Sequence, residues 1–215
     1  MRIGVLGTGR VGGILGTRWA AKGHSVTFGS RDPGSEKSRQ LVEKSGGSVS
    51  VRSIAEAVGS AEVVLLATPY QAASTLLPSL GELGDRVLID CSNPLKPDLR
   101  GLLVSGETSA AEQMAGWASG GRVVKAFNVA SSATMAQPIY EGQAASLFYC
   151  GDDKEAKQIV RQLVADLDFE PVDAGPLSIA RYLESLAMLY IHLAVKEGWG
   201  SHCAFRMMRR EAPRK

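Results

Sequence analysis

The residues with the clearest chemical potential lie near the N-terminus, in the run Gly7-Thr8-Gly9-Arg10-Val11-Gly12. A short apolar stretch with the length of a β-strand precedes this run, and apolar residues spaced as on one face of a helix follow it. In such a loop the first glycine allows a tight turn, the second lets the backbone approach a pyrophosphate, and the third lets the helix pack closely on the sheet. The free N–H groups at the start of the helix attract phosphate. We therefore predict that this run binds a dinucleotide, with a purely structural glycine turn as the alternative.

The end of the second predicted strand indicates which dinucleotide binds. NAD-binding folds place an Asp or Glu about twenty residues beyond the glycines, where it accepts hydrogen bonds from the ribose. This chain has no acidic residue before Asp32, and its second strand leads instead into Ser30 and Arg31. A hydroxyl and a planar guanidinium suit a 2′-phosphate. We predict NADP(H) as the cofactor, held by Ser30 and Arg31; a solvated Arg31, with Asp32 as a displaced ribose ligand, is the alternative.

Polar residues also follow three later strands, which we predict over 62–67, 86–90 and 122–126. The carboxyl ends of parallel strands line the ligand crevice of a doubly wound sheet, so these residues converge there. Each could alone be an ordinary turn, because Thr-Pro and Asn-Pro often begin loops. We predict that they contact the cofactor or its redox partner; the residues are Thr68, Pro69, Tyr70, Ser92, Asn93, Pro94 and Asn128.

The chain offers no evident general acid and no metal site. None of its three histidines follows a strand end, and His202 has no further metal ligands nearby. Reduction of a carbonyl compound needs a general acid. Hydride exchange between two cofactors does not, because each ring system accommodates its own charge. We therefore name no catalytic residue and favour cofactor-to-cofactor transfer, with Lys125 or Tyr70 left open as an acid.

Composition and charge exclude several other classes of protein. Of 215 residues, 45% are hydrophobic and 21% are charged, as in globular proteins. A formal net charge of +2 gives no reason to expect a nucleic-acid partner. No stretch approaches the roughly 18 apolar residues of a membrane span, so we predict no membrane partner. The three widely spaced cysteines favour reduced thiols, and hence a cytoplasmic protein.

The elements that must position these residues alternate between strand-like and helix-like segments, which indicates a parallel sheet wrapped by helices. The predicted fold is a Rossmann-type, doubly wound α/β fold with a mainly parallel sheet. We assign an NADP-binding domain to residues 1–128 and a small C-terminal helical part to residues 129–215. Apolar residues surround a long helix predicted over 178–197. Its own sheet can cover only one side of such a helix, so we predict a homodimer with this helix in the interface.

With these motifs in place, the chain resembles the NADP oxidoreductases that use the 8-hydroxy-5-deazaflavin coenzyme F420. The resemblance runs almost end to end and rests on the glycine-rich run and on further motifs: Gly29-Ser30-Arg31, Ser92-Asn93-Pro94-Leu95, Gly151-Asp152-Asp153, and Asp173-Ala174-Gly175-Pro176-Leu177 leading to Arg181-x-x-Glu184-Ser185-Leu186. It implies that Thr8, Arg10 and Val11 touch the pyrophosphate. It also implies that Ser30 and Arg31 hold the 2′-phosphate and that the protein is a homodimer. The same domain looks like the NADPH-binding part of membrane ferric reductases, which shares the Lys-Ala-Phe-Asn run found at 125–128.

The hydride acceptor is the part of the function that these motifs leave open. In the archaeal members of the family a histidine follows the strand equivalent to 122–126, near the deazaflavin. This chain has Asn128-Val129-Ala130-Ser131 at that place. We therefore predict hydride transfer between nicotinamide and a deazaflavin or flavin-type acceptor. The alternatives are an NADPH-dependent reductase of a small imine or carbonyl substrate, and a non-catalytic NADP(H)-binding sensor.

Overall fold

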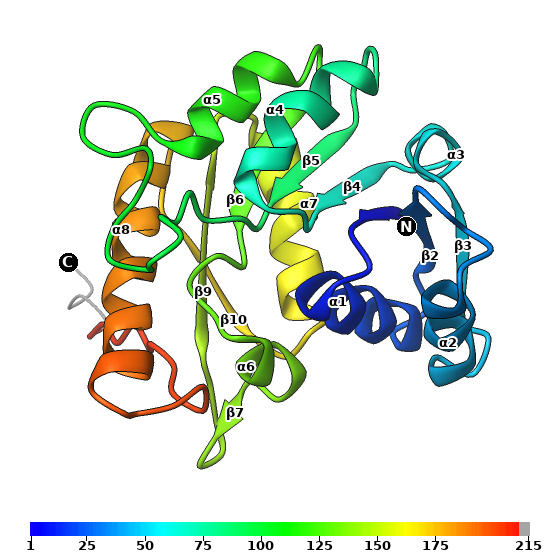
Figure 1. Cartoon of the computed structure of the whole chain (residues 1–215). Helices are drawn as coiled ribbons and strands as arrows, with labels where there is room; N and C mark the ends of the chain where they lie inside the picture. The colour runs from blue at the N-terminus through cyan, green and yellow to red at the C-terminus, as the bar shows by residue number, and fades with distance from the viewer. Residues whose placement is uncertain (211–215) are drawn as a thin grey trace, which may run out of the picture.

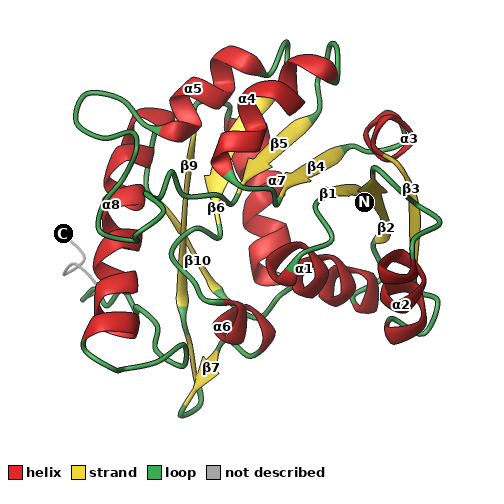
Figure 2. Ribbon diagram, in the orientation of Figure 1, coloured by secondary structure: helices red, strands yellow, loops and turns green. Residues whose placement is uncertain are grey.

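The computed structural model describes residues 1–210 and builds them around one eight-stranded sheet (Figure 1, Figure 2). The strand order is β10-β9-β6-β5-β4-β1-β2-β3. Neighbouring strands from β1 to β6 run parallel, which confirms the predicted doubly wound α/β fold. Their bounds are β1 (Arg2–Leu6), β2 (Ser25–Ser30), β3 (Val49–Ser53), β4 (Val63–Leu66), β5 (Val87–Asp90) and β6 (Arg122–Ala126).

The chain reverses direction after β6. Strand β9 (Ser146–Gly151) lies beside β6 but runs antiparallel to it, and β10 (Glu170–Asp173) pairs parallel with β9. A small hairpin, β7 (Ile139–Tyr140) and β8 (Gln143–Ala144), precedes β9. The carboxyl ends of β9 and β10 therefore lie beside the amino ends of β1 to β6, on the side of the sheet away from the cleft-forming strand ends. The described residues after 128 thus extend the same sheet, while residues 211–215 lie outside the described part of the chain.

Helices cover both faces of the sheet, because successive residues of a buried strand point to opposite sides. Val63 and Leu65 of β4 belong to one hydrophobic cluster, which α1 and α7 cover, whereas Val64 and Leu66 belong to a second, which α4, α5 and α8 cover. No helix within residues 1–210 is long and apolar enough to cross a membrane. The helices are α1 (Arg10–Ala21), α2 (Glu36–Lys44), α3 (Ile54–Gly59), α4 (Tyr70–Ser79), α5 (Ala110–Trp117), α6 (Ser132–Ala136), α7 (Lys154–Ala165) and α8 (Ala180–Ile191).

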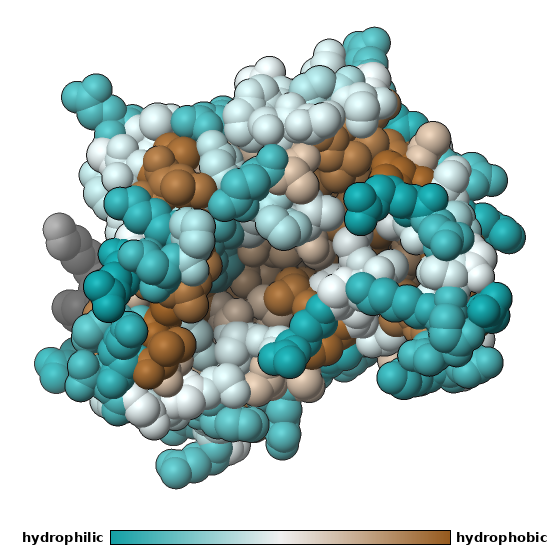
Figure 3. All heavy atoms as spheres, in the orientation of Figure 1, coloured by the Kyte–Doolittle hydropathy of each residue, from teal (hydrophilic) through white to brown (hydrophobic). Residues whose placement is uncertain are grey.

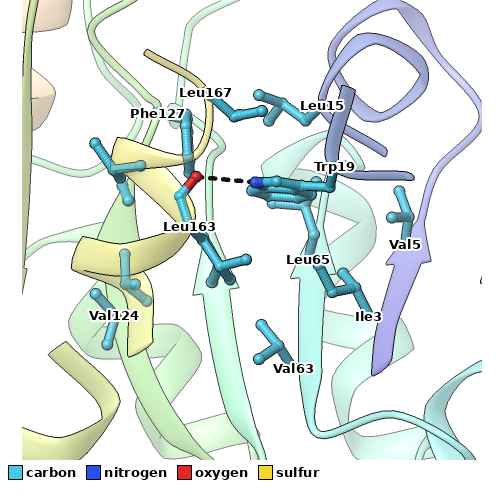
Figure 4. Packing of buried hydrophobic residues seen from close by; sticks show 14 of the residues in the cluster. Ile3, Val5, Leu15, Trp19, Val63, Leu65, Val124, Phe127, Leu163 and Leu167 are labelled. Carbon is cyan, nitrogen blue, oxygen red and sulfur yellow. Dashed lines mark hydrogen bonds between the residues drawn. The ribbon is translucent and has the colours of Figure 1, made fainter. Parts of the chain in front are cut away.

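An aromatic contact joins α1 to the end of β6 at the centre of the first cluster (Figure 4). Trp19 and Phe127 meet edge to face with 5.7 Å between ring centroids. The indole Nε1 of Trp19 donates a hydrogen bond to the Leu163 carbonyl oxygen at 2.9 Å, so the buried N–H is satisfied. The contact fixes the first residue after β6, and therefore the start of the loop that borders the crevice.

The helix predicted over 178–197 is not one continuous α-helix. A 3₁₀ turn (Leu177–Ile179) precedes α8, and a π-helical turn (His192–Lys196) follows it. In this last turn the Glu197 N–H bonds to the His192 carbonyl oxygen, which widens the helix before Gly198, with its positive φ, ends it. The prediction was wrong about continuity, because a run of apolar residues does not reveal a local change of helical pitch.

Candidate functional site

The glycine-rich loop turns from β1 into α1 as predicted, and close contacts explain two of its glycines. Gly7 has a φ of +123°, and a Cβ at this position would lie 2.4 Å from the Ala67 carbonyl oxygen. A Cβ on Gly12 would lie 2.2 Å from the Gly7 carbonyl oxygen. At Gly9, in contrast, a Cβ would have no atom within 4 Å. The first and third glycines are required by the fold, and the space beside the second is open to a ligand.

A cleft of about 760 Å³ opens beside this loop, over the carboxyl ends of β1, β2 and β4. Ile54, Ala72 and Leu76 give it apolar walls. A volume of this size with mixed walls is typical of small-molecule and cofactor sites. Seven of the predicted site residues line the cleft: Gly7, Thr8, Gly9, Ser30, Arg31, Thr68 and Pro69.

One end of the cleft carries positive charge. Arg31 and Lys37 both line it, and the ion pairs within residues 1–210 involve neither of them. Sequence reasoning missed Lys37, because it stopped at the strand end and did not follow the chain into α2. The signal was Ser35, whose hydroxyl caps α2 and so brings the first turn of that helix to the cleft. Asp32 lines the cleft as well, so its role as a ribose ligand stays open.

The other eight predicted residues do not line this cleft: Arg10, Val11, Gly12, Tyr70, Ser92, Asn93, Pro94 and Asn128. Arg10 and Val11 open α1, with Arg10 exposed and Val11 half-buried. Tyr70 turns toward α5, where its hydroxyl donates a hydrogen bond to Gln113 Oε1 at 2.5 Å and its ring packs against Trp117. Burial and the negative charge of Glu184 raise the pKa of Tyr70. Tyr70 therefore joins α4 to α5 and offers no free hydroxyl for proton transfer.

One predicted residue at the end of each of β4, β5 and β6 has an unusual property. Within residues 1–210, the buried side-chain polar atoms that lack a hydrogen-bond partner are Thr68 Oγ1, Ser92 Oγ and Asn128 Oδ1. Ser92 and Asn128 are only 9% and 6% exposed. Buried polar atoms nearly always have a hydrogen-bond partner in folded proteins, so three unpaired atoms at the carboxyl ends of neighbouring strands indicate that a hydrogen-bonding group outside the chain is missing. These atoms are candidates for ligand contacts.

Asn93 and Asn128 hold each other in a reciprocal pair. Asn93 Nδ2 donates to the Asn128 carbonyl oxygen at 2.8 Å, and Asn128 Nδ2 donates to Asn93 Oδ1 at 2.9 Å. Asn128 Nδ2 also donates to the Leu183 carbonyl oxygen of α8 at 3.0 Å. Both of these partners are acceptors, which fixes the orientation of the Asn128 amide. Its unpaired atom is therefore an oxygen, and a ligand must bring a donor to it.

Backbone geometry at Phe127 explains how Asn128 reaches this position. Phe127 has a φ of +66°, which is uncommon for a residue with a side chain. As a result the consecutive residues Ala126 and Phe127 both face the first hydrophobic cluster, and the usual alternation is broken. Asn128 then faces α8 instead. Packing of the Phe127 ring against Trp19 and Phe169 holds the unfavourable backbone conformation in place.

A fully buried ion network lies beneath the same loops. The Lys125 ammonium donates to Asp90 Oδ2 at 2.7 Å, to Glu184 Oε1 at 2.9 Å and to the Ser92 carbonyl oxygen at 2.7 Å. The side chains of Lys125, Asp90 and Glu184 are 0%, 0% and 1% exposed. Burial alone would lower the pKa of Lys125, but the two carboxylates raise it above its ordinary value, so the ammonium stays charged. This enclosure argues against Lys125 as the proton donor that the sequence left open.

The surface of the protein is hollowed in the middle of the molecule (Figure 3). The hollow lies between the parts of the chain around α1 and around α8, and its floor is mostly neutral to hydrophobic in colour. Ligand groups in hollows of this kind are held by apolar contact and oriented by a few polar atoms.

Comparison with known proteins identifies the class to which this fold and site belong. The family model of NADP oxidoreductases, coenzyme F420-dependent, matches residues 2–94. The F420-dependent NADP reductase of Methanothermobacter thermautotrophicus is 31% identical over 210 residues, which cover 91% of this chain and 90% of that enzyme. The corresponding enzyme of Methanothermobacter marburgensis is 32% identical, with 91% and 93% covered. The chain therefore belongs to the F420-dependent NADP oxidoreductase family.

Other relatives extend the comparison. Metalloreductase STEAP3 from Rattus norvegicus is 33% identical over 187 residues, and this chain spans only 36% of its length. A solved structure assigned as an F420-dependent NADP reductase from Arthrobacter sp. FB24 superposes with a TM-score of 0.87 at 29% identity, with 97% of this chain and all of that chain (100%) covered. A reductive aminase from Aspergillus terreus gives a TM-score of 0.67 at 19% identity, with 92% and 62% covered, and so shares the fold.

The glycine geometry generates a prediction that separates binding from folding. Gly9 has an extended backbone that alanine can adopt, so Gly9→Ala should change the free energy of unfolding by no more than about 0.5 kcal/mol. The added methyl group occupies the space beside the loop, so NADPH affinity should fall by about tenfold or more. Gly12→Ala, the matched control, should instead lower the free energy of unfolding by about 1–3 kcal/mol. Urea unfolding and NADPH fluorescence titration measure the two effects; undiminished NADPH binding by Gly9→Ala would contradict the assignment.

Proposed function

We propose that this protein transfers a hydride between the nicotinamide of NADP(H) and a second planar ring of the deazaflavin or flavin type. Membership of a family of NADP-dependent oxidoreductases supplies the class of reaction. The observation that carries the finer proposal is the set of unpaired buried atoms, Thr68 Oγ1, Ser92 Oγ and Asn128 Oδ1. An unpaired buried polar atom costs about 1–3 kcal/mol. A ligand that supplies the missing partners recovers this free energy.

The carboxamide group of nicotinamide has the complementary hydrogen-bonding groups. It carries two N–H donors and one carbonyl acceptor, whereas Asn128 Oδ1 can only accept and the hydroxyls of Thr68 and Ser92 can donate or accept. The cleft beside Gly9 suits the adenosine and pyrophosphate half of the cofactor. The nicotinamide half then extends along the sheet edge toward the ends of β5 and β6, where the unpaired atoms lie.

The titratable side chains near this edge support transfer between two rings over reduction of a carbonyl compound. Lys125 is enclosed by its three acceptors, and Tyr70 donates to Gln113. Of the histidines, His24 pairs with Asp166 and His192 pairs with Glu197, away from the cleft. A carbonyl oxygen that accepts a hydride needs a proton. A flavin or deazaflavin ring spreads the added charge over its own heteroatoms.

An acceptor assay tests this function directly. NADPH deuterated at the transferable position is mixed anaerobically with coenzyme F420, FMN, FAD, a ferric chelate or a cyclic imine, and the decay of NADPH absorbance is followed. We expect turnover with F420 or a flavin, with deuterium recovered on the acceptor ring. Turnover with the imine alone would replace the proposal by small-substrate reduction. Binding of NADPH without turnover of any acceptor would replace it by a sensor function.

Selectivity for NADP(H) over NAD(H) is the second prediction. We propose that Ser30, Arg31 and Lys37 bind the 2′-phosphate at the charged end of the cleft. Loss of a charge-assisted hydrogen bond costs about 1.5–3 kcal/mol, so Arg31→Ala should weaken NADPH binding about tenfold to a hundredfold and leave NADH binding nearly unchanged. Arg39→Ala is the matched control, because Arg39 pairs with Glu36 outside the cleft. Equal affinity of the wild type for both nucleotides, measured by calorimetry, would refute the assignment.

The exposed side of α8 supports the further proposal of a homodimer. Leu183 and Tyr190 are buried against the protein's own core, whereas Tyr182 and Leu189 are 64% and 49% exposed. Hydrophobic side chains gather on the surface along α8 (Figure 3). Burial of apolar area is worth about 25 cal/mol per Å². In a dimer with its two-fold axis beside α8, the exposed apolar side of α8 in each copy would be covered by the same surface of the other copy.

Substitution of the exposed pair tests the dimer without disturbing the core. Tyr182→Glu combined with Leu189→Asp should give monomers that still bind NADPH, because neither side chain touches the nucleotide cleft. Leu186 and Leu193 are half-buried, so charges there would also damage packing. Ile139→Asp, at an exposed site on the β7–β8 hairpin, is the control and should leave the assembly intact. Sedimentation of the wild type as a monomer at micromolar concentration would end this proposal.

A further inference from the structure

The buried ion network clamps the backbone of Ser92 from both sides. The Ser92 N–H donates to Asp90 Oδ1 at 2.8 Å, and the Ser92 carbonyl oxygen accepts from Lys125 Nζ at 2.7 Å. Because both backbone groups of Ser92 are already hydrogen-bonded, its side-chain hydroxyl is the polar group that it can still present to a ligand. That hydroxyl is buried and unpaired. The network therefore fixes where the hydroxyl lies and uses none of its hydrogen-bonding capacity.

Helix α8 links the same network to Asn128. Glu184 accepts from Lys125 and from the first two N–H groups of α5, at Ala110 (3.0 Å) and Ala111 (3.2 Å). The preceding residue, Leu183, supplies the carbonyl oxygen that accepts from Asn128 Nδ2. One turn of α8 thus sets both the position of Lys125 and the orientation of the Asn128 amide. The unpaired oxygen of that amide points away from Leu183 as a consequence.

Stability alone does not explain such a network. Three charged side chains leave water completely, and replacement of buried ion pairs by well-packed apolar side chains is often neutral or stabilising. Two carboxylates face a single ammonium, and the N-terminal end of α5 helps to balance the remaining negative charge. What an apolar core could not provide is the fixed direction of the hydrogen bonds to Ser92 and Asn128. The network therefore fixes the positions of Ser92 and Asn128 beside the crevice.

We propose that Lys125 is a positioning residue for the nicotinamide end of the site: through Ser92 and Glu184 it aims the Ser92 hydroxyl and the Asn128 amide oxygen at the cofactor without touching it. This inference rests on the proposed function, which places nicotinamide beside these two atoms. Lys125 has no route to the reacting atoms, since its three donors are all engaged within the protein. Its effect on catalysis is therefore indirect and passes through the loop after β5 and through α8.

The test compares two ligands that share the adenosine, the 2′-phosphate and the first 5′-phosphate; 2′,5′-ADP lacks the second phosphate, the second ribose and the nicotinamide. NADPH occupies the whole site, whereas 2′,5′-ADP carries the adenosine and the 2′-phosphate and lacks nicotinamide. For Lys125→Met we expect the affinity for 2′,5′-ADP to stay within about twofold of the wild type and the affinity for NADPH to fall by about tenfold. Lys157→Met is the matched control, because Lys157 pairs with Asp173 at the far edge of the sheet and has no link to Ser92. It should change neither affinity.

A double-mutant cycle separates positioning from a general loss of stability. Ser92→Ala removes a hydroxyl that has no hydrogen-bond partner within residues 1–210, so it leaves the fold intact. If Lys125 acts through Ser92, then Lys125→Met should reduce NADPH affinity less in the Ser92→Ala background than in the wild type. An equal reduction in both backgrounds, or an unchanged ratio of the two ligand affinities in a folded Lys125→Met protein, would overturn the proposal.

A second variant covers the case in which Lys125→Met does not fold. Asp90→Asn keeps the shape of the side chain but must lose one of its two links, since the amide nitrogen cannot accept from the Ser92 N–H or from Lys125. The same selective loss of NADPH affinity is expected, and an unchanged ratio in the folded variant would again contradict the idea. Failure of the proposed function looks different. In that case the wild type itself would pass no hydride from NADPH to F420 or to a flavin, whatever the ratio of the two ligand affinities.

Discussion

Lys125 donates its three hydrogen bonds to Asp90, Ser92 and Glu184 in a space closed to water. An ammonium group has only donors, so its burial requires acceptors to arrive from several directions at once. Here they come from β5, from the loop after β5 and from α8. The carboxylate of Glu184 in turn satisfies the first N–H groups of α5. The position of α8 against the sheet is therefore a condition for burying a charge in the middle of it.

A second constraint acts on the other side of Asn128. Phe127 adopts a left-handed backbone conformation, which costs about 1–2 kcal/mol for a residue with a side chain. Its edge-to-face contacts with Trp19 and Phe169 offset this cost. Lys125 is thus anchored on one face of the sheet and Phe127 on the other. Asn128 follows directly, and its amide is held by Asn93 and α8 without freedom to rotate.

The parts of the site that the sequence could predict are those encoded by neighbours in the chain. The glycine-rich loop and the residues Ser30 and Arg31 depend on local turn geometry, so residue types and spacing were sufficient. The ion network depends on contacts that spacing does not encode, because Lys125 lies 35 residues from Asp90 and 59 from Glu184. The reversed direction of β9 escaped prediction for a related reason. A short buried strand has the same apolar pattern in either direction.

The dependence of Lys125 on Glu184 also bears on the order in which the chain can fold as it is made. The sheet from β1 to β6, which carries the cleft beside the glycine-rich loop, is complete by Ala126. Until α8 emerges, however, Lys125 lacks one acceptor and the first N–H groups of α5 have no carboxylate to bind. Contacts between residues so far apart in the chain require the closure of a long loop, whose entropy cost slows the final steps of folding. On the ribosome, the space around Lys125 in the N-terminal half therefore stays open to water until the C-terminal segment covers it.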